Sequence, residues 1–223
     1  AKERVAARGQ ANVGFARYVG FAGPGGESIK NALSHLNLPE PAGNFFLYLG
    51  CGDLRAGGID KRVAGNSDRT VLMIDTKVGG KAHDLTDPFV ARHLIALASD
   101  SRCDGVLATI PCSTWSVARF RGGDPQPVRN VTYPLGIPNS YGMIPAEVVK
   151  ANRTADHCCA CAMAAAQHGG CFIFENPCSR GIDSPHGLSG REMHAALWSH
   201  PSVMNLHTLY GSMHTFDKCM TGA

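Results

Sequence analysis

The sequence predicts an α/β domain built on a doubly wound, mostly parallel β-sheet. Three short apolar runs, at 45–49, 70–74 and 105–110, have the length and composition of strands that are buried on both faces. Helical patterns separate these runs, and the alternation of strand and helix indicates right-handed crossovers between parallel strands. In sheets of this kind, ligands bind beyond the carboxyl ends of the strands.

The size and composition of the chain favour one domain over two. The 223 residues are 44% hydrophobic, which suffices for a single core, and we expect the domain to span residues 28–223. Residues 1–27 mix basic residues with glycine and predict a basic, glycine-rich N-terminal arm. The net charge of +3 is compatible with a nucleic-acid partner but does not by itself indicate one.

The cysteine count and the hydropathy pattern indicate the cellular compartment. The chain has no run of eighteen apolar residues and no secretory leader, so we expect neither a membrane span nor export. Its nine cysteines are odd in number and irregularly spaced, which argues against a disulfide framework. We therefore expect an intracellular protein of a reducing compartment, the cytoplasm or the nucleus.

The elements of the first half follow from caps, apolar runs and proline. Ser28 is a helix cap, and Pro88 favours the first turn of a helix. The expected elements are a helix from 28 that ends before 39, the strand 45–49, a helix over about 56–64, the strand 70–74, a short extended segment at 83–85 and a helix that begins at 87–88.

In the second half, a long loop interrupts the alternation. Residues 121–145 contain five prolines and four glycines with no clean period, and long loops without structure of their own are usually functional or disordered. The expected elements are the strand 105–110, that loop, a helix from 146 to about 168, the strand 171–174, a helix near 189–198 and an ambiguous tail.

A glycine turn follows the first strand as Leu49-Gly50-Cys51-Gly52. Two glycines let the backbone approach a ligand closely, and Asp75 closes the next strand, where a carboxylate can accept hydrogen bonds from ribose hydroxyls. A dinucleotide pattern would need a third glycine where Arg55 stands, so an adenosyl cofactor is favoured over a nicotinamide. The simpler interpretation is a tight turn without a ligand.

Candidate catalytic residues stand at two further strand ends. Pro111-Cys112 follows the buried strand 105–110, and a cysteine on such a turn can act as a nucleophile, although a free cysteine is more often a small buried hydrophobe. Glu175-Asn176-Pro177 ends the strand 171–174, where a carboxyl group could hydrogen-bond to or protonate a ring nitrogen. A purely structural role for Glu175 is the alternative.

The glycine turn, Asp75 and His83-Asp84-Leu85 resemble the S-adenosylmethionine site of class I methyltransferases. With Pro111-Cys112 and Glu175-Asn176 in the same order, the chain resembles the Rossmann-like DNA cytosine carbon-5 methyltransferases, and its tail looks like a compact viral or mobile-element type. The resemblance implies S-adenosylmethionine as cofactor, held by Leu49, Gly50, Cys51, Gly52, Asp75, Asp84, Leu85 and Pro111. It also implies that Cys112 attacks carbon 6 of cytosine while Glu175 holds ring nitrogen 3.

The substrate implied is nucleic acid, with DNA favoured over RNA. Candidate substrate contacts are Ser113, Trp115, Arg119, Arg121 and Asn176; Arg129 is a further possible phosphate contact, and Phe120, Tyr133 and Tyr141 are further stacking residues. A solvated loop with aromatic anchors is the alternative for these loop residues.

Three departures from the family keep other functions open. Ser113 stands where the family has Gln, Pro177 where it has Val, and no large target-recognition region is present, so a partner or a larger polypeptide could supply recognition. The alternatives are methylation of RNA or of an exocyclic amine, and a non-catalytic module that keeps the fold as a scaffold. A zinc site in the Cys- and His-rich stretch 157–178 is disfavoured, because Cys158 and Cys161 supply one ligand pair and the second is missing.

Overall fold

The computed structural model describes residues 28–54, 56–120, 122–123, 125–182, 185, 187–212 and 214. The expected N-terminal arm over residues 1–27 lies outside the described residues, as does Arg121. No helix of the described part combines the length and the apolar character needed to cross a membrane.

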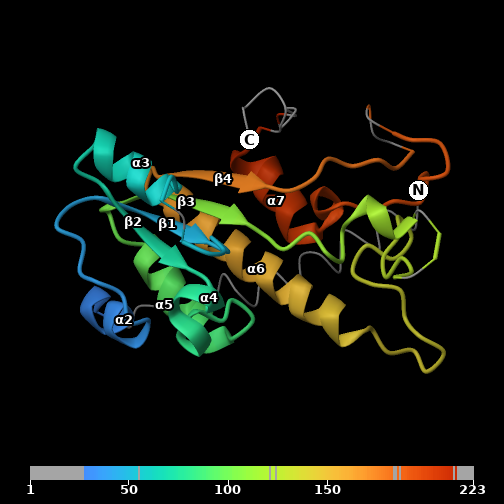
Figure 1. Cartoon of the computed structure of the whole chain (residues 1–223), viewed down its shortest axis with the longest axis horizontal. Coiled ribbons are helices and arrows are strands. Elements are labelled where there is room, and N and C mark those ends of the chain that lie inside the picture. Colours follow the sequence, from blue (N-terminus) through green and yellow to red (C-terminus); the bar gives the residue numbers. More distant parts are fainter. Residues whose placement is uncertain are drawn as a thin grey trace.

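Four parallel strands form the sheet, and this confirms the predicted fold class. The strands are β1 (Phe45–Leu49), β2 (Thr70–Ile74), β3 (Cys103–Thr109) and β4 (Cys171–Glu175). Their order in the sheet is β2-β1-β3-β4, and the arrows in Figure 1 all run the same way. The segments that leave their carboxyl ends, including the long loop before α6, therefore gather at one end of the molecule.

The strand order identifies where a ligand is expected. From β1 the chain crosses to β2 on one side and then returns past β1 to β3 on the other side. Right-handed crossovers of this kind place α3 (Ile59–Asn66) on one face and α5 (Pro88–Ala98) with α6 (Ala146–Gln167) on the opposite face. The carboxyl ends of β1 and β3 thus form the topological switch point of the sheet.

The core lies between the sheet and the layer of α5 and α6. Alternate residues of β1 face it, because Phe45, Leu47 and Leu49 are buried whereas the residues between them are only half-buried. The facing side of α6 consists largely of small residues, alanine and cysteine, so the helix packs close to β3 and β4. A buried methylene contributes about 0.8 kcal/mol, so the buried side chains of this layer stabilise the fold.

Two expected helix starts are confirmed by their caps. The Ser28 hydroxyl accepts a hydrogen bond from the Asn31 N–H (3.4 Å) at the start of α2 (Ile29–His35). The Asp87 carboxylate accepts one from the Phe89 N–H (2.8 Å), and Pro88 occupies the first turn of α5. Each side chain satisfies a backbone donor that has no partner within its helix.

Two expected elements are wrong. The segment 83–85 is not extended: Gly80–His83 form a 3₁₀ turn, η1, which follows the short helix α4 (Thr76–Gly79), and the buried His83 ring bonds to the Leu36 carbonyl (2.7 Å). The helix near 189–198 is also not observed. Its backbone bonds to neighbouring loops instead, and only the 3₁₀ turn η3 (Leu197–Ser199) and the helix α7 (Pro201–Tyr210) follow.

Candidate functional site

The glycine turn at the end of β1 is held by Asp75 of the neighbouring strand end. Gly50 and Gly52 both have a φ of +70°, a conformation that glycine adopts without strain. The Gly52 N–H donates to Asp75 Oδ2 (3.0 Å), and the Gly50 N–H donates to the Ile74 carbonyl (2.8 Å). The second oxygen of Asp75 accepts from the Lys77 N–H (2.9 Å), which begins α4.

The two glycines differ in what surrounds them. A Cβ atom at Gly50 would lie 2.5 Å from the Thr109 carbonyl oxygen, so the turn is packed directly on the end of β3. A Cβ atom at Gly52 would meet nothing within 4 Å. The inner side of the turn is therefore closed by the sheet, while the outer side is open for a ligand to approach the backbone. This arrangement fits an adenosyl group held at the turn and at Asp75.

The other predicted cofactor residues differ in how much of each is available to a ligand. Leu49 and Leu85 are buried, at 1% and 8% exposure, so they can present only their backbone to a ligand. The Asp84 carboxylate accepts hydrogen bonds from the Thr86 N–H (2.9 Å) and hydroxyl (2.7 Å) and thereby shapes its own loop. Burial and the nearby Asp75 raise the pKa of the Cys51 thiol to about 11, so it stays protonated at neutral pH.

The predicted nucleophile and acid lie at neighbouring strand ends. β3 and β4 pair with Thr109 opposite Glu175, and the Cys112 turn, which we define as residues 112–116, leaves β3 just beyond this pair. The Asn176 side-chain N–H donates to the Ile110 carbonyl (2.7 Å) and so ties the two exits together. Glu175 is half-buried, and Pro111 and Cys112 are exposed.

Cys112 differs from most other described cysteines in its surroundings. Four thiols, those of Cys103, Cys158, Cys159 and Cys161, are buried, and burial raises the pKa of each well above 9. A thiol that stays protonated is a poor nucleophile. Cys171 is exposed as well, but it begins β4 and so stands at the opposite end of the strand from Glu175.

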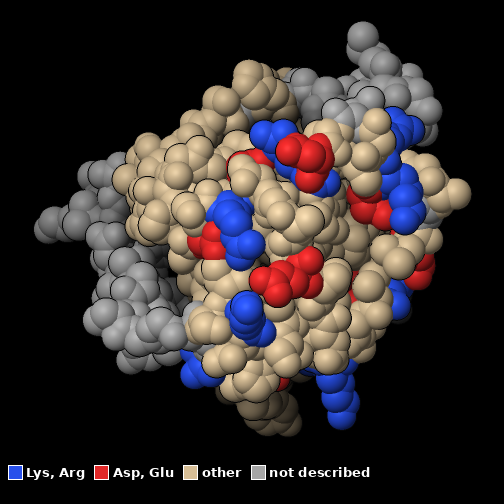
Figure 2. Space-filling model, turned by 90° about the vertical axis from the view of Figure 1, so that its left-hand side faces the viewer, with Lys and Arg blue, Asp and Glu red and all other residues tan. Residues whose placement is uncertain are grey.

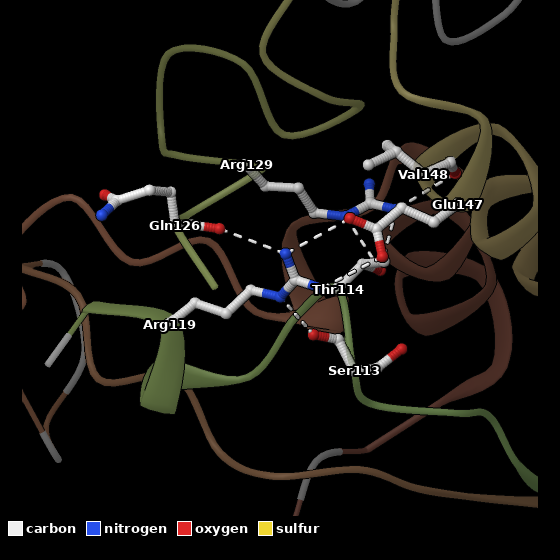
Figure 3. A network of polar contacts seen from close by, with 7 residues as sticks. All are labelled: Ser113, Thr114, Arg119, Gln126, Arg129, Glu147 and Val148. Carbon is white, nitrogen blue, oxygen red and sulfur yellow. Dashed lines mark hydrogen bonds and ion pairs between the residues drawn. The ribbon is translucent and has the colours of Figure 1, made fainter. Parts of the chain in front are cut away.

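Two of the predicted phosphate contacts are engaged within the protein (Figure 3). The Arg119 guanidinium donates to the Ser113 carbonyl (2.7 Å) and pairs with the Glu147 carboxylate (3.1 Å). Arg129 is 1% exposed and donates to the Thr114 hydroxyl (3.2 Å). Arg129 therefore has no surface on which a phosphate could bind, because its guanidinium lies between the Cys112 turn and α6.

The aromatic residues near the site separate into buried and exposed ones. Trp115 is 2% exposed, and the Arg129 guanidinium lies over its ring at 4.1 Å, so a base could stack there only after this contact opened. Phe120 packs edge-on against His194 at 5.5 Å between ring centres. Tyr133 and Tyr141, at 48% and 84% exposure, present open ring surface on the long loop.

Sequence reasoning missed His194, which connects the loop after β4 to the Cys112 turn. Its buried ring donates from Nε2 to the Trp115 carbonyl (2.8 Å), and Nδ1 accepts from the Arg180 N–H (3.0 Å). The two partners fix the neutral tautomer, and burial lowers the pKa of this histidine. A single histidine in an irregular segment carries no periodic signal that could have identified it.

The Cys- and His-rich stretch has a structural explanation. Within the described residues, no group of three or more His, Cys, Asp or Glu side chains is arranged to hold a metal ion. His157 bonds through Nδ1 to the Leu85 carbonyl (2.7 Å), and the cysteines of α6 face the core. These residues therefore pack the helix onto the sheet.

The charges at the opposite end of the molecule are mixed. Figure 2 shows the side of the protein to which the amino ends of the strands point, where basic and acidic side chains are interspersed. At the amino ends of β2 and β3, Arg69 forms an ion pair with Asp104. A surface of both signs does not favour a polyanion, so this face has no advantage over the candidate site as a nucleic-acid surface.

Comparison of the chain with protein-family models, curated proteins and solved structures finds no match.

Proposed function

We propose that this protein transfers a methyl group from S-adenosylmethionine to carbon 5 of cytosine in nucleic acid, with DNA favoured over RNA. One observation carries the proposal: the exposed Cys112 and the carboxyl group of Glu175 leave adjacent strands at the same edge, next to an open glycine turn. A thiol, an acid and a cofactor turn at a topological switch point are the components that this reaction requires.

The chemistry assigns a separate task to each side chain. The Cys112 thiolate adds to carbon 6 of the pyrimidine, and Glu175 donates a hydrogen bond or a proton to ring nitrogen 3. The electron pair displaced from the 5,6 double bond then makes carbon 5 nucleophilic. After methyl transfer, a base removes the proton from carbon 5 and the thiolate leaves, which restores the double bond and frees Cys112.

The residues of the glycine turn fit the proposed methyl donor. Bound there, S-adenosylmethionine would supply an electrophilic methyl group. Gly52 leaves room for the donor beside the backbone, and Asp75 holds the turn in shape through the Gly52 N–H. The remaining lone pairs of the Asp75 carboxylate can accept hydrogen bonds from ribose hydroxyls.

Few of the described residues are available to recognise a target sequence. Arg119 and Arg129 are already engaged with protein groups, whereas Tyr133 and Tyr141 have ring surface available for bases. A compact enzyme of this kind therefore depends on short loops, a partner protein or a larger polypeptide for its choice of sequence.

The test is incubation with labelled S-adenosylmethionine and either DNA or RNA, followed by nucleoside analysis. We expect label in 5-methylcytosine. Cys112→Ala should lower the rate by on the order of 10⁴-fold and Glu175→Gln by about 10²-fold. Cys171→Ala is the matched control, since it removes the second exposed thiol among the described cysteines and should leave the rate unchanged.

Other outcomes separate the alternatives. A substrate with 5-fluorocytosine should trap Cys112 covalently, because fluorine cannot leave as a proton does. Turnover without an adduct would instead indicate methylation of an exocyclic amine, which needs no cysteine. No binding of S-adenosylmethionine by calorimetry would identify a scaffold and remove the proposal.

A further inference from the structure

Side chains from elsewhere in the chain hold the three residues that follow Cys112. Arg119 Nε donates to the Ser113 carbonyl (2.7 Å), Arg129 donates twice to the Thr114 hydroxyl (both 3.2 Å), and His194 donates to the Trp115 carbonyl (2.8 Å). The turn closes on itself through the Trp115 N–H and the Cys112 carbonyl (2.9 Å). The backbone of the Cys112 turn is thus fixed from several directions while the thiol itself stays exposed.

Arg129 links the Cys112 turn to α6. All five of its N–H donors are used: besides Thr114, they reach the Pro134 carbonyl (2.8 Å), the Asn152 side-chain oxygen (2.7 Å) and the Val148 carbonyl (3.3 Å). Its guanidinium also lies over the Trp115 ring at 4.1 Å. One side chain therefore connects the turn, the long loop and the first two turns of α6.

The burial of Arg129 is energetically unfavourable unless its contacts compensate for it. Within the described residues no carboxylate forms an ion pair with Arg129, and desolvation lowers its pKa to about 10, so it remains charged at neutral pH. Neutral acceptors must therefore replace its water shell completely. A buried charge with this geometry fixes the neighbouring backbone in one arrangement, because any shift would leave a donor unpaired.

Arg119 makes the second connection between the turn and α6 (Figure 3). Besides Ser113, its guanidinium donates to the Gln126 carbonyl (3.1 Å) and to both oxygens of Glu147 (3.3 and 3.1 Å). Glu147 belongs to the first turn of α6. A planar guanidinium can reach these three groups together, and a lysine ammonium cannot.

We propose that Arg119 and Arg129 are positioning residues, which hold the Cys112 turn against α6 so that the thiol is presented in one orientation to the substrate ring. This inference rests on the proposed methyl transfer. It assigns to these arginines a role different from phosphate binding. A displacement of the attacking atom by about 1 Å can lower a rate by about 10²-fold, so the arginines act on kcat more than on KM.

Thr114 and Arg119 provide the most specific variants. Thr114→Val keeps the side-chain shape but removes the acceptor of two Arg129 donors, and Thr114→Ser keeps the acceptor. Arg119→Lys keeps the charge beside Glu147 but loses the contact with Ser113. Arg153→Lys, on the exposed side of α6, is the matched control for the Arg-to-Lys change.

The measurements are kcat, KM, thermal midpoint and amide hydrogen exchange of a peptide that spans residues 112–116. We expect Thr114→Val to lower kcat by about 30-fold and Arg119→Lys by about 10-fold, each with KM changed by less than about threefold. Thr114→Ser should recover most of the rate. Exchange at the Trp115 amide should accelerate by at least about tenfold in the two impaired variants, because its bond to the Cys112 carbonyl opens more often.

Two results would overturn the inference. One is a kcat that falls only with the fraction of folded protein, and the other is turn exchange that stays at the wild-type rate in Arg119→Lys. Arg119→Lys is decisive if Thr114→Val does not fold, because lysine keeps the positive charge beside the half-exposed Glu147 carboxylate and so preserves the ion pair. If the wild type transfers no methyl group, the proposed function fails, and exchange in the same variants still shows whether the arginines hold the turn.

Discussion

Gly50 and Gly52 allow a matched test of the glycine turn. Both have a φ of +70°, so alanine at either position incurs about 1 kcal/mol of backbone strain. Roughly 0.5 kcal/mol of this is offset because alanine lowers the entropy of the unfolded chain. At Gly52 nothing else opposes the methyl group, and Gly52→Ala should destabilise the fold by about 0.5 kcal/mol.

Gly50→Ala has a second effect. Its Cβ atom would lie 2.5 Å from the Thr109 carbonyl oxygen, well inside van der Waals contact, and β3 would have to move. Overpacking of this kind costs about 1–3 kcal/mol, so the total destabilisation should reach about 1.5–3.5 kcal/mol. Urea denaturation measures both variants, as a shift of the midpoint at constant slope. Equal midpoints for the two variants would refute the close packing of the turn on β3.

The same pair tests the cofactor site. The methyl group of Gly52→Ala would occupy the open side of the turn, so the affinity for S-adenosylmethionine should fall by at least about tenfold while stability changes little. Calorimetry at a temperature where both proteins are folded gives the affinities. An unchanged affinity would mean that the ligand binds elsewhere.

Three further predictions concern single side chains around the site. Burial and the nearby Arg129 lower the pKa of His200 to about 3. Below pH 6.5, His200 is therefore protonated in the unfolded chain but stays neutral in the folded chain. Stability should therefore fall by about 2 kcal/mol from pH 7 to pH 5, and His200→Leu, measured by denaturation at both pH values, should remove that loss. Asn176→Ala should cost about 1–2 kcal/mol in the same assay, because it removes the bond to the Ile110 carbonyl; an unchanged midpoint would show that this bond is dispensable. Asp75→Asn has only one acceptor oxygen for two backbone N–H groups and should weaken S-adenosylmethionine binding by about 1–3 kcal/mol, whereas a wild-type affinity by calorimetry would contradict our assignment of Asp75.

Local signals made most of the fold predictable. The strands of the sheet are short apolar runs with clear ends, and the caps Ser28 and Asp87 mark helix starts through single hydrogen bonds. The expected extended conformation of residues 83–85 is wrong because three residues beside a strand end have no period of their own. Its conformation is set by the bond between the His83 ring and Leu36, 47 residues away.

The sequence predicted that the site lies at the strand ends, but it did not predict the contacts within the site. Cys112, in the turn after β3, and Glu175, the last residue of β4, could be placed at one edge because parallel strands end together. The roles of Arg119 and Arg129 could not, because both were expected as phosphate contacts on a loop. Their partners instead include the side chains of Glu147 and Asn152 on α6, which are 28 and 23 residues away. The α7 helix was missed although Pro201 stands at its first turn, since the apolar pattern around it is weak.

The parallel arrangement has a consequence for how this protein reaches its working form. In the part of the chain that the structure describes, no strand pairs with its neighbour through a hairpin, and the bond between Asn176 and Ile110 joins positions 66 residues apart. Such distant pairings form late, because long segments must be ordered before they meet. A nascent chain that ended within the long loop would hold Cys112 without Glu175, so reactivity of the thiol toward a pyrimidine should emerge only when synthesis has passed β4.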